Sequence, residues 1–133
     1  MKPVKEAAEQ IALVARCRKE GILIISTENS LNFPVESILH FVSPEKQKRF
    51  TMFIRQLLSK LTQKRISLGM EVGYPDLFIP ECKLFIEMKK RDGGIISKEQ
   101  KIMHEKLKDL NYIVKVCHGA KEAWNEIRKE KLL

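Results

Sequence analysis

The sequence has few cysteines and no long apolar segment. Its three cysteines, Cys17, Cys82 and Cys117, lie far apart, and no CxxC pair occurs. An odd, scattered set of cysteines is typical of a reducing compartment, and the missing pairs exclude a zinc ribbon. The apolar run at 22–25 is far shorter than the roughly 20 residues that span a bilayer. The N-terminal residues carry several charges where a signal peptide would be apolar. We therefore expect a cytosolic protein.

Several familiar sequence signatures are also absent. There is no Walker loop or dinucleotide fingerprint, and we find neither internal repeats nor low-complexity segments. His40, His104 and His118 do not have the spacing of metal ligands, so we interpret them as core or surface residues. Trp124 is interpreted as a packing residue rather than a platform for base stacking. Nucleotide-phosphate loops and histidine metal centres are therefore not expected.

Acidic residues are outnumbered by basic ones. The 133 residues include 25 Lys and Arg against 17 Asp and Glu, which gives a net charge of +8. A basic protein favours polyanionic partners, with nucleic acid first and an anionic membrane second. With 44% hydrophobic and 32% charged residues, the chain has the composition of a globular protein. We expect one domain that spans residues 1–133.

Hydrophobic periodicity predicts an α/β protein. Helices are expected at 4–19, 43–64, 97–110 and from 119 onward, and short strands at 22–26, 76–79, 83–88 and 112–117. Gly21 and Asn111 suit helix stops, and Ser97 with Gln100 forms a capping-box pattern. Ser43 followed by Pro44 is typical of a helix start. The order of elements predicts a mixed sheet flanked by helices.

The predicted helix 43–64 has two different sides. One side is apolar, with Phe50, Phe53, Ile54, Leu57, Leu58 and Leu61. The other side is basic, with Lys46, Lys48, Arg49, Arg55, Lys60 and Lys64. A basic helix side is most often solvated surface, and contact with DNA is the alternative interpretation.

The Glu-x-Lys pattern occurs three times, so the pattern alone carries little information. Glu81 with Lys83 falls in a predicted turn, and Glu99 with Lys101 begins a predicted helix. Only Glu87 and Lys89 end an apolar strand, where residues two apart point to the same face. The strand's other residues would then point into the core.

A hairpin between 76–79 and 83–88 would bring Asp76 opposite Glu87. Two carboxylates and the Lys89 ammonium would then meet at one end of the sheet. Carboxylate oxygens are ligands for Mg²⁺, which polarises a phosphodiester and lowers the pKa of bound water. Lys89 could orient that water or neutralise phosphate charge. The alternative is a structural salt bridge at a strand end.

The segments 69–77 (Gly-Met-Glu-Val-Gly-Tyr-Pro-Asp-Leu), 85–89 (Phe-Ile-Glu-Met-Lys) and 97–100 (Ser-Lys-Glu-Gln), with Gly94, together resemble the virus-type replication-repair nuclease (VRR-NUC) family. This family belongs to the PD-(D/E)xK nuclease superfamily. The resemblance extends from about residue 6 to 116. It implies a restriction-endonuclease-like α/β core, a metal-dependent deoxyribonuclease activity that uses Mg²⁺ or Mn²⁺, and, from the family's distribution, a phage origin with a site of action in the host cytoplasm.

The resemblance also implies roles for individual residues. Asp76, Glu87 and the backbone carbonyl of Met88 would be metal ligands, and Lys89 would be the catalytic lysine. Gln100 would support this site from the following helix. The acid that completes the metal site from the N-terminal helix would be Glu6, with Glu9 as the alternative. The same resemblance names five DNA contacts: Gly69, Gly73, Lys90, Arg91 and Lys98. For the two glycines an ordinary turn or a positive φ remains the alternative.

Short proteins of this family resemble dimeric junction-resolving enzymes. This resemblance implies a homodimer that cuts branched DNA, such as four-way junctions, in replication, repair or recombination, with two sites on opposed strands. Two other hypotheses remain open. The chain could be a non-catalytic nucleic-acid-binding domain of the same fold, or a structural protein in which the ion pair only stabilises a strand end.

Overall fold

The computed structural model describes residues 2–27 and 33–131. Where the sequence predicts one domain, the chain divides into two compact units. The first, which we call the sheet unit, combines Met1–Glu28 with Gly73–Leu133. The second, the helical unit, is Asn29–Val72. Each unit is described by itself.

The sheet unit is built on four strands in the order β1-β2-β3-β4. These are β1 (Ile25–Ser26), β2 (Leu77–Ile79), β3 (Leu84–Lys89) and β4 (Ile113–His118). The pairs β1–β2 and β2–β3 are antiparallel, whereas β3–β4 is parallel. The predicted mixed α/β sheet is therefore confirmed, although only the last two residues of the predicted strand 22–26 are paired.

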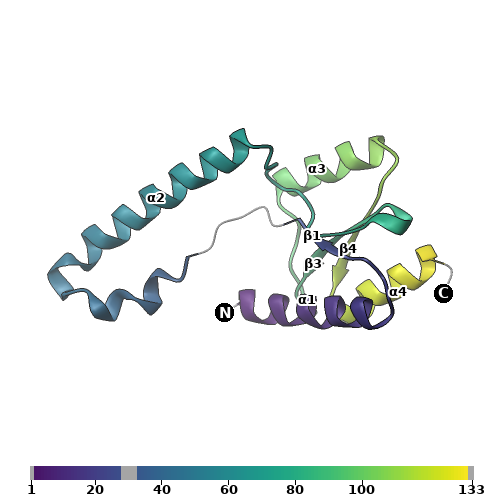
Figure 1. The fold of residues 1–133 in the computed structure, drawn as a ribbon, viewed down its shortest axis with the longest axis horizontal. Coiled ribbons are helices and arrows are strands. Elements are labelled where there is room, and N and C mark those ends of the chain that lie inside the picture. Colours follow the sequence, from purple (N-terminus) through teal and green to yellow (C-terminus); the bar gives the residue numbers. More distant parts are fainter. Residues whose placement is uncertain (1, 28–32, 132–133) are drawn as a thin grey trace. The chain divides into compact units, whose positions relative to one another are not determined.

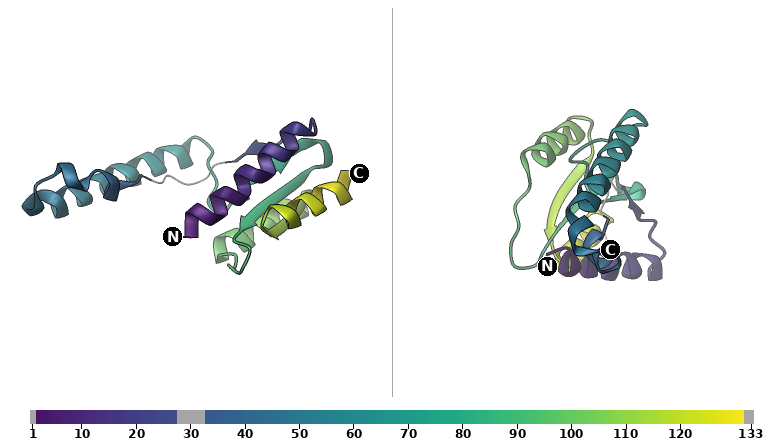
Figure 2. Two further views of the ribbon diagram at one scale, coloured as in Figure 1. Left: turned by 90° about the horizontal axis from the view of Figure 1, so that it is seen from below. Right: turned by 90° about the vertical axis from the view of Figure 1, so that its left-hand side faces the viewer.

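Three helices cover the two faces of this sheet (Figures 1 and 2). Helix α3 (Lys98–Asp109) lies on one face, and α1 (Lys2–Lys19) and α4 (Ala120–Lys131) lie on the other. Each helix turns an apolar side toward the strands. Leu13 and Cys17 of α1 join Ala123, Trp124 and Ile127 of α4 in one core cluster. Met103 and Leu107 of α3 form a second cluster with Phe85 and Val114.

The central strand β3 alternates between these two clusters. Leu84, Ile86 and Met88 belong to the cluster with α1 and α4, while Phe85 belongs to the cluster with α3. Because residues two apart share a face, Glu87 and Lys89 point to the side of α3. All six residues of the strand are buried. The predicted division of faces is confirmed, and α3 also takes Glu87 and Lys89 out of solvent.

Local turn chemistry matches the sequence in the sheet unit. A 3-10 turn at Pro80–Cys82 joins β2 to β3, and Lys83 after it is left-handed with φ 52°. At the start of α3, the backbone N–H of Gln100 donates to the Ser97 hydroxyl and the Ser97 N–H donates to the Gln100 side chain. The capping box is therefore confirmed, as is the left-handed Asn111 with φ 70°.

The helical unit contains α2 (Gln47–Ser67), which follows three 3-10 turns at Val35–Ser37, Leu39–Phe41 and Pro44–Lys46. The predicted helix is confirmed, and Ser43 and Pro44 are the N-cap and first residue of the 3-10 turn that leads into it, although the Ser43 side chain makes no capping hydrogen bond. The side-chain amide of Gln47 instead donates to the carbonyls of Leu39 and Val42, at 2.9 and 3.1 Å. No residue of α2 is buried, so its apolar side is only half-covered or exposed.

Among the described residues, none of the helices has both the length and the apolar character needed to cross a membrane.

Gly73 is held against the first turn of α3. Its φ is +81°, and a Cβ added there would lie 2.5 Å from the Glu99 carbonyl oxygen and 2.8 Å from the Gln100 nitrogen. Gly21, with φ +72°, has no atom within 4 Å of the same position. A side chain at Gly73 would therefore collide with the backbone of α3, which cannot move aside as a flexible side chain could.

We expect Gly73→Ala to lower the free energy of unfolding by more than Gly21→Ala. Both changes strain a left-handed backbone, at about 1 kcal/mol, but only the first also displaces α3. Urea denaturation of the two variants measures the difference. Equal destabilisation would contradict the close packing of Gly73.

Candidate active site

Two carboxylates face each other across the β2–β3 hairpin. Asp76 directly precedes β2, and the pairing of Leu77 with Ile86 places it opposite Glu87. As directly opposed residues of the hairpin, they carry their side chains on the same face of the sheet. Glu87 is only 2% exposed. The sequence prediction that these two acids converge is therefore matched by their positions in the sheet unit.

The backbone holds Asp76 in a fixed orientation. Its Oδ2 accepts a hydrogen bond from the Met88 N–H at 2.8 Å. Its own carbonyl accepts from the N–H of Thr27 at 2.9 Å, which ties the residue to the end of β1. Asp76 is thus anchored to both neighbouring strands.

The acid pair strongly changes the titration of Asp76. Burial contributes most, and together with the hydrogen bond and negative charge of Glu87 it raises the pKa of this carboxyl to about 7. The Met88 N–H and the Lys89 charge act in the opposite direction. Protonation of one of two neighbouring acids relieves their repulsion. A divalent cation bound to both would relieve it in the same way, which makes the pair chemically suited to a hard metal ion.

Gln100 of α3 holds the Lys89 side chain, which lies on the same face of the sheet as Glu87. The lysine is 7% exposed, and its Nζ donates to Gln100 Oε1 at 3.2 Å. The same Gln100 oxygen accepts from the Ser97 N–H at 2.8 Å. The capping box therefore has a second consequence, because it fixes the side chain that holds the lysine. The predicted supporting role of Gln100 is consistent with this geometry.

His104 is a site residue that the sequence interpretation missed. It is 4% exposed, and its Nε2 lies 3.5 Å from Glu87 Oε1. Burial, followed by the charges of Lys108 and Lys89, lowers its pKa. A neutral imidazole therefore lies beside the Glu87 carboxylate. The signal was its spacing from Gln100, since residues four apart share a helix face.

The two acids of α1 have different surroundings. Glu9 accepts from the Arg91 side chain at 2.6 Å and from the Ala120 N–H at 2.7 Å. The bond from Ala120 contributes most to its lowered pKa. Glu9 therefore caps the start of α4 and is tied to Arg91. Glu6 lies one turn earlier on the helix side that also carries Leu13 and Cys17, on the sheet face opposite α3.

Among residues 6–27 and 33–131, whose side chains are described, no three or more His, Cys, Asp and Glu residues are arranged to hold a metal ion. The structure thus brings Asp76 and Glu87 together but does not add Glu6 or Glu9 to them as a third ligand. Glu6 and the Met88 carbonyl stay predictions.

The predicted DNA contacts fall into two groups. Lys98 is exposed at the start of α3, Arg91 is exposed beside Glu9, and Lys90 is half-buried directly after β3. These three lie near the acid pair in the chain and remain predicted contacts. The glycines have structural explanations, because Gly73 packs against α3 and Gly69, with φ +108°, follows α2 in the helical unit.

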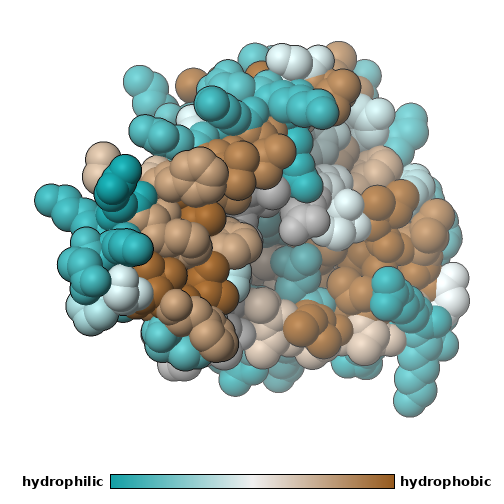
Figure 3. Space-filling model, turned by 60° about the vertical axis from the view of Figure 1, so that its left-hand side comes forward, coloured by the Kyte–Doolittle hydropathy of each residue, from teal (hydrophilic) through white to brown (hydrophobic). Residues whose placement is uncertain are grey.

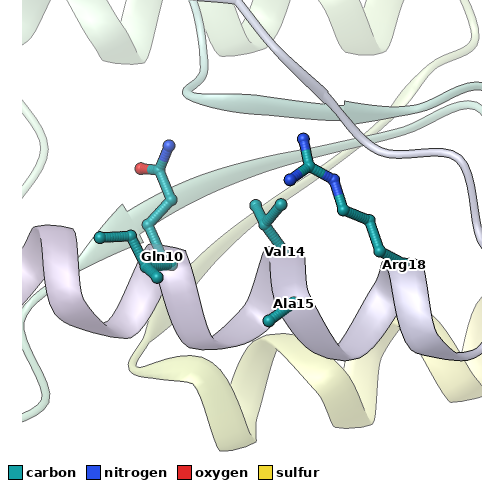
Figure 4. Close-up of a pocket in the computed structure, with 5 residues that line it drawn as sticks. Gln10, Val14, Ala15 and Arg18 are labelled. Atoms are coloured by element: carbon teal, nitrogen blue, oxygen red, sulfur yellow. The ribbon is translucent and has the colours of Figure 1, made fainter.

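Two hollows lie on the surface of the sheet unit. One, of about 220 Å³, follows α1, where Gln10, Val14 and Arg18 project to one side (Figure 4). The other, of about 360 Å³, has Ala8, Glu9, Arg91 and Asp92 in its lining. Neither Asp76 nor Glu87 is among their described lining residues, so these hollows do not extend the acid pair.

No protein-family model, no curated protein and no solved structure matches this chain. The geometry of the sheet unit and the sequence are therefore the basis of the function proposed below.

We expect the acid pair to make folding stability depend on pH. The pKa of Asp76 rises from 3.8 in an unfolded chain to about 7, so the folded protein holds a proton that the unfolded chain releases. The free energy of unfolding should fall as the pH rises between these values, by at most about 1.4 kcal/mol per pH unit.

Urea denaturation from pH 4 to pH 8, with a chelator present, measures this slope. Asp76→Asn keeps an acceptor for the Met88 N–H but cannot ionise, so its slope should be flatter than that of the wild type. Equal slopes in the two proteins would contradict the raised pKa.

Proposed function

We propose that the chain is a metal-dependent DNA endonuclease with a PD-(D/E)xK core of the VRR-NUC type. The observation that supports this most is the pairing of Asp76 with Glu87 across the hairpin, where Glu87 is buried and Asp76 half-buried, with Lys89 held on the same face by Gln100. A purely structural ion pair does not require two acids side by side, where their repulsion is unfavourable.

The chain's own residues supply the chemistry in distinct ways. Asp76 and Glu87 would hold Mg²⁺ or Mn²⁺, with Glu6 and the Met88 carbonyl as the further ligands that the family resemblance implies. When bound, this ion polarises the scissile phosphate and lowers the pKa of a bound water. Lys89 stabilises negative charge on the phosphate, and Gln100 keeps its ammonium directed toward the acids.

The substrate class is proposed to be branched DNA, such as four-way junctions. The net charge of +8 supports a polyanionic substrate. The family resemblance supports a homodimer, in which a two-fold axis would relate two sites on opposed strands. Phosphate contacts would dominate the affinity, so binding should weaken steeply with salt.

Cleavage of labelled junction, flap, splayed and linear duplexes with Mg²⁺ or Mn²⁺ tests this proposal. Asp76→Asn, Glu87→Gln and Lys89→Ala should each lower the cleavage rate by at least about 100-fold, because each removes charge at the reacting phosphate. A chelator should abolish cleavage of every substrate.

The Glu-x-Lys triplet of α3, Glu99 to Lys101, provides matched controls. Glu99 and Lys101 are exposed, so Glu99→Gln and Lys101→Ala should leave cleavage unchanged. Binding without any metal-dependent cleavage would favour the non-catalytic nucleic-acid-binding domain. Equal cleavage of linear and branched DNA by a monomer would reject the junction preference and leave the nuclease.

A further inference from the structure

Most of the protein's excess positive charge lies on one helix. Helix α2 carries six Lys and Arg residues and no Asp or Glu, against a net charge of +8 for the whole chain. All six are exposed. Within the described part of the chain, no ion pair involves a side chain of α2. The six basic residues are Lys48, Arg49, Arg55, Lys60, Lys64 and Arg65.

Three of these cations lie where the basic side of the helix meets the apolar side, next to an aromatic ring at the border. At about 100° per residue, Arg49, Phe53, Lys60 and Lys64 fall within a sector of roughly 60°, and they span about 22 Å along the axis. We call these four residues the basic row. Phe53 is 60% exposed, so its ring is available to a partner.

The helical unit packs a different side of α2 against its own 3-10 turns. Gln47 bonds to the carbonyls of Leu39 and Val42, and the half-buried residues Phe50, Ile54 and Leu58 follow the same side of the helix. The basic row is turned away from this covered side. The space-filling view shows one face of the molecule, on which apolar and polar side chains are interleaved (Figure 3).

Charge decides among the partners that could occupy the basic row. Pairing with α2 of a second copy would bring two helices of six unpaired cations together, which is unfavourable. An amphipathic membrane helix needs a continuous apolar stripe. Here the exposed stripe of Phe53, Leu57 and Leu61 is only about 12 Å long, since Lys64 ends it one turn after Leu61. Lys60 flanks it on one side. A strand of nucleic acid fits better, since it offers phosphates to the cations and bases to the ring.

We propose that the basic row of α2 binds a single-stranded segment of nucleic acid, with Phe53 stacking on a base. Proteins that bind single strands combine a cationic track with exposed aromatic rings. Stacking requires an unpaired base, which the single-stranded arms of flap and splayed duplexes supply. The inference deepens the proposed function by naming how the helical unit engages the substrate, and it can be tested without cleavage.

The charge contribution is tested with the triple variant Arg49→Gln, Lys60→Gln and Lys64→Gln. Its control is Lys101→Gln, Lys106→Gln and Lys129→Gln, which removes the same charge from exposed residues of the sheet unit. Fluorescence anisotropy with a labelled 20-nucleotide single strand, in chelator and at several salt concentrations, gives the affinities. The α2 variant should bind at least about 10-fold more weakly, and its salt slope should drop by about 2. Equal losses in the two triple variants would overturn the proposal.

The stacking contribution is tested with Phe53→Ala and Phe53→Leu. Both should weaken single-strand binding by about 5-fold or more, because leucine keeps apolar area but has no ring to stack. Binding of a linear duplex should change little. If Phe53→Leu binds like the wild type, stacking is wrong. Circular dichroism should show the same helix content in all variants, since the changed residues are exposed.

Two further measurements separate this inference from its alternatives. Because single-strand binding is measured in chelator, where metal-dependent cleavage is absent, a failed nuclease assay leaves the inference standing. Sedimentation of the α2 triple variant should show the same oligomeric state as the wild type. If that variant instead dissociates, or loses binding to anionic lipid vesicles while keeping single-strand binding, the basic row belongs to a second copy or a membrane and the proposal is overturned.

Discussion

The sheet unit depends on how it accommodates two neighbouring acids at one point of the sheet, one of them buried and the other half-buried. Asp76 and Glu87 repel each other when both are ionised, and burial strengthens that repulsion. The Met88 N–H and the Lys89 charge compensate in part, since both lower the pKa of Asp76. The repulsion that remains favours a bound cation. Two adjacent acids, paired across the hairpin, differ in this respect from a salt bridge between one acid and one base.

A single local motif connects the fold to this site. Ser97 and Gln100 close the first turn of α3, and the oxygen that completes the capping box also accepts from Lys89. Gly73 allows the loop before Asp76 to lie against the same turn. The start of α3 is therefore held from two directions, so a change in the cap would displace the lysine as well as weaken the helix.

The strongest local patterns in the sequence predicted their structures well. Alternation in 83–88, the capping box and the hairpin placed Glu87, Lys89 and Gln100 correctly, because strand parity and cap spacing are local properties. His104 could not be assigned in this way, since its meeting with Glu87 depends on how α3 lies on the sheet. Glu9 shows the same limit, because its partners Arg91 and Ala120 come from distant parts of the chain. The apolar side of α2 predicted a helix correctly, but no residue of that helix is buried, since periodicity indicates a face and not what covers it.

Acidic and basic residues are distributed differently in the two units. The acids that suit a cation lie in the sheet unit, whereas α2 of the helical unit carries six cations and no acid. Outside α2 the acids and bases of the chain are mixed, so an acid-free concentration of positive charge is a property of α2 and not of a whole unit. In the sheet unit, Lys89 lies on the same strand face as Glu87, and Gln100 of α3 accepts a hydrogen bond from its ammonium. The two arrangements therefore answer different requirements of the proposed function: α2 attracts phosphates, and the sheet unit offers carboxylates to a cation.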